Sequence, residues 1–179
     1  DDLLEVNRIT HNKIELERRV VDLREILDEA VSVTAPVFEK NRLHLAVSRS
    51  DEPLWAHIDS TRMQQVIVNL LGNAAKYSPE GGGTVQLSAS REGGEIVVVV
   101  RDQGVGIEPS MIEKIFELFV QGGKTLARTD AGMGVGLTLV RSLVTMHGGT
   151  VAAHSEGTGK GSAFTVRLPA SEGPVEDAE

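Results

Sequence analysis

Two carboxamides and an amine recur at helical spacing within residues 65–77. Asn69, Asn73 and Lys76 stand at positions i, i+4 and i+7, so a helix would place them in one polar stripe. An amide oxygen can complete the oxygen shell of Mg²⁺ when phosphates supply the charge, and a lysine beside it can neutralise a phosphate. A solvated face of an amphipathic helix has the same spacing, so the stripe alone leaves both interpretations open.

A carboxylate and two glycines follow an apolar run at residues 96–100. Asp102 stands at the end of this expected strand, and Gly104 and Gly106 allow the backbone to turn tightly and approach a flat ligand. A carboxylate in that place can accept a hydrogen bond from an exocyclic amine such as that of adenine. A turn in which Asp102 bonds its own backbone is the commoner explanation of such residues, so this segment alone does not define a site.

A glycine-rich loop feeds a helix at residues 132–137. Such a junction offers exposed N–H groups and the positive end of a helix dipole to a phosphate. The loop lacks the lysine of a P-loop, and no strand precedes it as in a dinucleotide-binding fingerprint. By itself it is a weak signal.

Three helices are expected to position these segments. A capping box at Asp22 and Glu25 begins the first, residues 59–61 can cap the helix that carries the polar stripe, and a third covers about 136–147. Residue 109 is a proline that can begin a further helix through residue 119. Residues 121–135, rich in Gly, Thr and charge, predict a mobile loop.

Alternating apolar residues predict the strands. They lie near residues 14–20, 43–47, 54–58, 85–89, 96–100, 150–154 and 162–168. The glycines at 93 and 94 predict a β-hairpin between the fourth and fifth of these strands. Strands in one layer and helices in the other predict an α+β fold, a two-layer α/β sandwich whose mixed, mostly antiparallel sheet is covered on one face by helices.

Composition bounds the function classes. The 179 residues carry a net charge of −8, which argues against a general nucleic-acid or anionic-membrane surface. The chain has no cysteine, and it has no apolar run near the roughly 20 residues that a membrane span needs. We therefore expect a cytoplasmic domain without nucleic-acid partners or direct membrane contact, although its parent protein could be membrane-anchored.

In this order, the three segments resemble the N, G1 and G2 boxes of the sensor histidine kinase catalytic domain, a member of the gyrase, chaperone and histidine kinase ATP-binding superfamily. Residues 115–119 resemble the family's F box, and residues 147–166 resemble its closing strands. The likeness spans about residues 20–169. Residues 1–19 would then be a truncated hairpin helix with a connector that includes His11, and residues 170–179 an acidic linker or tail.

The resemblance implies ATP and Mg²⁺ as cofactors. Asn73 would be the Mg²⁺ ligand, with Asn69 and Lys76 near the phosphates. Tyr77 would pack beside the adenine, and Asp102 would bind the adenine amine.

Two loops would complete this implied site. The base pocket would be shaped by Gly104, Gly106 and Ile107. A lid over the triphosphate would be formed around Gly132, Gly134, Gly136 and Leu137. Within the lid, Lys124 and Arg128 could reach phosphates or could simply be solvated charges.

One position bears on the reaction. In hydrolytic relatives of this fold, a glutamate one helical turn before the metal-binding asparagine acts as base toward water, whereas this chain has Asn69 there. An amide cannot take a proton at neutral pH, so transfer to a histidine is the better fit. A gyrase- or chaperone-type ATPase clamp is the alternative, and a degenerate nucleotide-binding scaffold is a third possibility.

None of the five histidines is followed by the acidic residue typical of the family's phosphoacceptor. The acceptor is therefore expected on a dimerisation hairpin absent from this fragment, so the fragment would contain no catalytic residue and would not autophosphorylate. The expected partners are that histidine-containing hairpin and a response-regulator receiver domain, and the fragment is expected to be a monomer.

Overall fold

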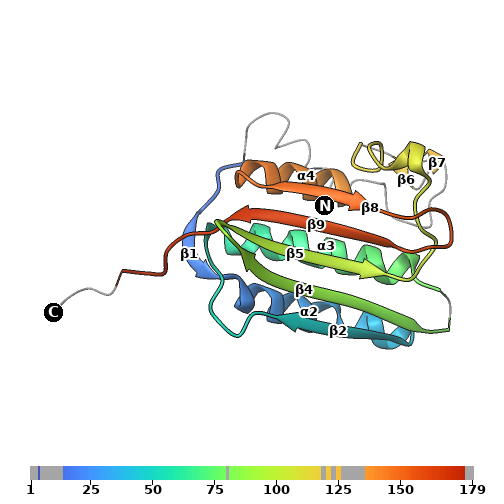
Figure 1. The fold of residues 1–179 in the computed structure, drawn as a ribbon, viewed down its shortest axis with the longest axis horizontal. Coiled ribbons are helices and arrows are strands. Elements are labelled where there is room, and N and C mark those ends of the chain that lie inside the picture. The colour runs from blue at the N-terminus through green and yellow to red at the C-terminus, as the bar shows by residue number, and fades with distance from the viewer. Residues whose placement is uncertain are drawn as a thin grey trace.

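A five-stranded sheet is covered on one face by three helices in the computed structural model (Figure 1). The structure describes Leu4 and residues 14–79, 81–117, 120–121, 124–125 and 136–175, so most of the expected hairpin helix and connector at residues 1–19, His11 included, falls outside the described residues. The helices are α2 (Leu23–Lys40), α3 (Ser60–Tyr77) and α4 (Gly136–Met146). No described helix is long and apolar enough to cross a membrane.

The sheet is mixed and mostly antiparallel, as the hydrophobic pattern predicts. Its strands in spatial order are β2 (Leu43–Arg49), β4 (Gly83–Glu92), β5 (Glu95–Asp102), β9 (Ser162–Pro169) and β8 (Thr150–His154). Only the β2–β4 pair is parallel, and β4 and β5 form the hairpin expected at the two glycines. The α+β fold class is thereby confirmed.

Side-chain caps begin the first two helices. The Asp22 carboxylate accepts a hydrogen bond from the Arg24 amide at 3.1 Å, and the Asp59 carboxylate accepts one from the Arg62 amide at 3.1 Å. Each cap satisfies an N–H group that has no partner inside its helix. The expected starts of α2 and α3 are therefore confirmed.

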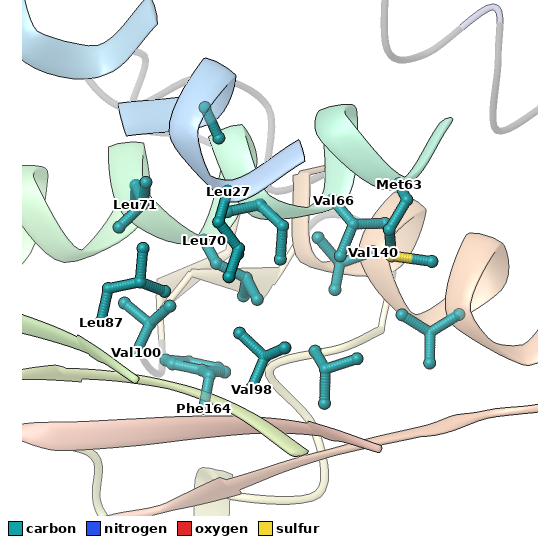
Figure 2. Close-up of a cluster of buried hydrophobic side chains, with 14 of the residues drawn as sticks. Leu27, Met63, Val66, Leu70, Leu71, Leu87, Val98, Val100, Val140 and Phe164 are labelled. Atoms are coloured by element: carbon teal, nitrogen blue, oxygen red, sulfur yellow. The ribbon is translucent and has the colours of Figure 1, made fainter. Parts of the chain in front are cut away.

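The core lies between the helices and the sheet. Figure 2 shows Leu70 and Leu71 of α3 and Leu27 of α2 packed above Leu87 of β4 and Val100 of β5, and all five side chains are almost fully buried. Fully burying one such side chain stabilises a fold by about 1.5–3 kcal/mol. This layer fixes α3 against β5, the two elements that carry most of the expected site.

The first expected strand is displaced. Residues 14–18 have no regular structure, and the strand there is β1 (Arg19–Asp22). It pairs antiparallel with β3 (Trp55–Ile58) in a separate two-stranded sheet. The alternating apolar residues at 14–20 therefore do not mark the bounds of a strand. Pairing with β3 determines that β1 lies at Arg19–Asp22.

The helix expected at 109–119 is wrong over its described part. A single 3-10 turn at Pro109–Met111 is followed by turns through Phe116. Ile115 and Phe116 are both buried, and the Phe116 ring meets Phe164 of β9 edge to face at 6.1 Å. Packing of these two consecutive side chains into the core takes precedence over helix propensity.

The loop expected at 121–135 contains regular structure where it is described. Two short strands, β6 (Val120–Gln121) and β7 (Lys124–Thr125), pair antiparallel. The rest of that loop lies outside the described residues.

Candidate nucleotide-binding site

The polar stripe of α3 lies on a helix whose other face is in the core. Asn69 and Asn73 are half-buried, while Met63, Val66, Ile67, Leu70 and Leu71 are buried. The Asn69 Nδ2 atom is buried and has no hydrogen-bond partner. A buried donor left unpaired costs about 1–3 kcal/mol, so this amide is suited to a ligand that brings an acceptor.

Lys76 and Tyr77 end the same helix side by side. The Lys76 ammonium lies 5.3 Å from the centroid of the Tyr77 ring, within the range of a cation–π contact. Although Lys76 as a whole is exposed, desolvation of its ammonium lowers its pKa, and burial raises the pKa of the Tyr77 hydroxyl. The pair thus presents a cation and an aromatic ring at the C-terminal end of α3.

Asp102 is buried at the end of β5, with 5% of its surface exposed. Its Oδ1 accepts a hydrogen bond from the Gly104 amide at 2.8 Å, and its Oδ2 accepts one from the Ser162 hydroxyl at 2.8 Å. The local turn that sequence alone could not separate from a ligand site is therefore present. A carboxylate offers about four lone-pair positions, so these two bonds leave room for a further donor.

The loop after Asp102 is attached directly to the end of α3. The Val105 amide donates to the Tyr77 carbonyl oxygen at 3.1 Å. A Cβ on Gly104 would stand 1.8 Å from that same oxygen, so only glycine permits this approach. The contact brings Asp102 to the end of the helix that carries Asn73.

A second loop supports the first from the other side. The Gly159 amide donates to the Val105 carbonyl at 2.7 Å, and the Ile107 amide donates to the Ser155 hydroxyl at 3.0 Å. Gly106 has a φ of +72° and a Cβ there would lie 2.1 Å from the Gly157 carbonyl oxygen. The loop at 102–107 is therefore held between α3 and residues 155–161.

The structure describes the third segment only in part. Gly136 and Leu137 form the first turn of α4, and the Thr138 hydroxyl donates to the Phe116 carbonyl at 2.9 Å. This bond ties the start of α4 to the segment that follows the Asp102 loop. Of the remaining expected lid residues, Lys124 is placed in β7 by its backbone, and Gly132, Gly134 and Arg128 lie outside the described residues.

Ser162 is a site residue to which sequence reasoning assigned no role. It stands directly opposite Asp102 in the β5–β9 register, and its hydroxyl donates to the buried carboxylate. The signal that could have found it is strand register, which places the first residue of β9 beside the last residue of β5. Register becomes visible only when the two strands are paired.

The match to a family model defines the class of this protein, an ATP-binding one. The chain belongs to the family described as histidine kinase-, DNA gyrase B-, and HSP90-like ATPase, whose model matches residues 58–172. Within that family its relatives place it among the ATP-binding catalytic domains of two-component sensor histidine kinases.

Curated relatives are longer kinases. The chain is 37% identical over 175 residues to hybrid signal transduction histidine kinase D of Dictyostelium discoideum. This match covers 94% of this chain and 11% of the Dictyostelium protein. It is 36% identical over 169 residues to alginate biosynthesis sensor protein KinB of Pseudomonas aeruginosa, covering 94% and 27% respectively. The chain thus spans about a quarter or less of these two relatives.

Solved structures show the same fold. Full-length ShkA in complex with AMPPNP matches with a TM-score of 0.83 and 31% identity, over 97% of this chain and 35% of that one. The mycobacterial sensor histidine kinase MprB matches with a TM-score of 0.72 and 28% identity, over 88% and 99%.

Proposed function

We propose that this domain binds ATP with Mg²⁺ and transfers the γ-phosphoryl group to a histidine on a helical hairpin of its parent kinase. The observation that carries the proposal is the bond between the Asp102 loop and the end of α3, because it joins a buried carboxylate to a helix whose Asn69 donor has no partner. ShkA, a relative of the same fold, is described in complex with the ATP analogue AMPPNP.

The donor set suits a metal that arrives with a nucleotide. Among the described residues, no three His, Cys, Asp or Glu side chains gather into a metal cluster. Asn73 makes no side-chain hydrogen bond to another described residue, so its neutral carboxamide oxygen is available as one ligand. Bound Mg²⁺ would supply charge neutralisation on the phosphates, whose oxygens complete the shell.

The other residues then have distinct tasks. Asn69 donates its unpaired N–H to a phosphate, and Lys76 supplies positive charge beside it. Tyr77 packs beside the adenine, while Asp102 accepts from the adenine amine with Ser162 holding its second oxygen. Their common task is positioning, because phosphoryl transfer needs little covalent chemistry from the protein.

The remaining part of the proposed site is formed by two loops. The base pocket is formed by Gly104, Gly106 and Ile107. Gly136 and Leu137, in the first turn of α4, are the described part of the proposed lid, whose further residues Gly132 and Gly134 lie outside the described residues.

An amide at position 69 favours histidine over water as the acceptor. Asn69 cannot remove a proton from water at neutral pH, whereas an imidazole is nucleophilic without a base from this domain. The partners that follow from this are the hairpin with its histidine and a receiver domain that takes the phosphoryl group onward. We also propose that the domain acts in the cytoplasm, where ATP is available, and that it is monomeric in isolation.

Phosphoryl transfer is tested by mixing this chain, γ-labelled ATP and the parent hairpin supplied in trans. Label on the hairpin histidine is expected, and none on a hairpin without that histidine. Multiple-turnover hydrolysis by the chain alone would instead support an ATPase clamp. Tight binding with neither reaction would support a nucleotide-binding scaffold.

Base recognition is tested by comparing ATP with GTP in calorimetry. The wild type is expected to prefer ATP, and Asp102→Asn is expected to lose about 1–3 kcal/mol of that preference, because a buried hydrogen bond to the base is lost. Ser162→Ala is the companion variant, in which the carboxylate stays but loses one hydrogen bond. Unchanged selectivity in both variants would contradict the assignment of Asp102.

A further inference from the structure

The connector ahead of β1, residues 14–18, is bonded to the end of the domain where α3 begins and α4 ends. The Glu17 amide donates to Asp59 Oδ2 at 2.9 Å, and the Arg18 guanidinium donates to the carbonyl oxygen of Met146, the last residue of α4. A cation at the last carbonyls of a helix is favourable, because the helix dipole is negative there. The connector is thus hydrogen-bonded both to the N-cap of α3 and to the last residue of α4.

A buried histidine that follows α4 links α4 to the N-cap of α3 by hydrogen bonds. His147 Nε2 accepts a hydrogen bond from the Asp59 amide at 3.1 Å, and His147 Nδ1 is bonded to the Leu143 carbonyl at 2.7 Å. Asp59 is 8% exposed and His147 is 4% exposed. We call the set Glu17, Arg18, Asp59, Met146 and His147 the clasp. Its polar groups bond one another across three segments that are distant in the sequence.

Helix α4 extends from the clasp to the proposed phosphate-binding segment. Its 11 residues span about 16 Å at 1.5 Å per residue. Leu139, Val140, Leu143 and Val144 are all 0% exposed, so the helix is packed along its length, and we expect it to move as a rigid unit. Its first turn, at Gly136, belongs to the proposed nucleotide site.

We propose that the clasp couples the connector to the nucleotide site, so that a docked connector raises affinity for ATP and bound ATP tightens the docking. The inference rests on the proposed function and adds a means of regulating it. A docked connector restricts α4 before the nucleotide arrives, which lowers the ordering cost of binding. Because coupling between two sites is reciprocal, the nucleotide strengthens the clasp by the same factor.

The affinity test uses two neighbouring arginines of the whole chain. Arg18→Ala removes the bond to Met146, whereas Arg19→Ala removes the same charge from an exposed side chain that makes no hydrogen bond or ion pair to a described residue. Calorimetry with ATP and Mg²⁺ is expected to show a Kd about fivefold or more weaker for the Arg18 variant, and a wild-type Kd for the Arg19 variant. Circular dichroism checks that both variants are folded.

Amide exchange tests the reverse direction, the effect of the nucleotide on the connector. In the wild type, ATP with Mg²⁺ is expected to slow exchange of the Glu17 amide by the same factor, and Arg18→Ala is expected to abolish this effect. The coupling is overturned if the Kd of the Arg18 variant is unchanged or tighter. It is also overturned if ATP does not change the exchange rate of the Glu17 amide. If the wild type does not bind ATP at all, the proposed function fails instead, so the two failures are distinct.

Discussion

The two halves of α3 use polar residues in opposite ways. In the first turn, both carboxylate oxygens of Asp59 accept backbone hydrogen bonds, from Glu17 and Arg62, and its amide donates to His147. Farther along the helix, Asn69 has a buried side-chain N–H without a partner, and the side chain of Asn73 makes no hydrogen bond to another described residue. Asp59 is satisfied within the protein, whereas Asn69 and Asn73 carry polar groups that we propose a nucleotide completes.

The difference separates stability from function on a single helix. Polar groups that are buried and paired stabilise a fold, and removing one partner leaves the other unsatisfied. Polar groups that are buried and unpaired lower stability, and a bound ligand that completes them is one reason for a protein to retain them. Substitution of Asp59 should therefore lower the free energy of unfolding, whereas substitution of Asn69 or Asn73 should weaken nucleotide binding without lowering the free energy of unfolding appreciably.

The largest expected effect is at Asn73. Asn73→Ala should weaken the affinity for ATP with Mg²⁺ by about 100-fold or more, or close to 3 kcal/mol, because the proposed metal ligand is lost. The free energy of unfolding should change by less than about 0.5 kcal/mol. Calorimetry and urea unfolding measure the two quantities, with Gln64→Ala, which lies on α3 away from the stripe, as the control. Normal Mg²⁺-dependent affinity in the Asn73 variant would remove it from the site.

Next in size is the loss of the cap at Asp59. Asp59→Ala should lower the free energy of unfolding by about 2–3 kcal/mol, because the N-cap is lost and the Glu17 and Arg62 amides lose their acceptor. Urea unfolding measures the loss. Asp59→Asn keeps one acceptor oxygen and should cost clearly less; equal losses in the two variants would show that capping is not the cause.

Asn69 offers the sharpest contrast with Asp59. Asn69→Ala should raise the free energy of unfolding by about 1 kcal/mol, because a buried donor without a partner is removed and alanine favours a helix. The same variant should bind ATP more weakly than the wild type. Thermal unfolding and calorimetry on one preparation test the pair of effects. A less stable variant would mean that the amide is satisfied in the folded protein.

The smallest effect is a pH dependence at His147. Burial lowers its pKa from the usual 6.5, Arg18 lowers it further, and the Leu143 carbonyl and Asp59 oppose the shift. The folded state therefore binds this proton less readily than the unfolded chain, so its contribution to stability is complete above about pH 6.5 and is lost as pH falls below it. Urea unfolding at several pH values between 5 and 8 should show a steeper loss for the wild type than for His147→Gln.

Local sequence patterns predicted much of the fold and indicated the candidate site. Caps at Asp22 and Asp59, the alternation of β2 and β3 and the two glycines between β4 and β5 are all signals within a few residues, and the structure has each element where they indicate it. The ordered N, G1 and G2 segments likewise indicated the family. Roles for individual site residues stay predictions that the experiments above address.

What the sequence by itself determined is the set of elements, because capping, periodicity and turn chemistry act between neighbouring residues. Tertiary structure alone decided that β1 pairs with β3, that residues 109–117 form a 3-10 turn and further turns in place of an α-helix, and that the Ser162 hydroxyl bonds Asp102. It also decided that Arg18 meets Met146, 128 residues away. Such contacts depend on how layers pack and strands register, and no short stretch of sequence records that arrangement.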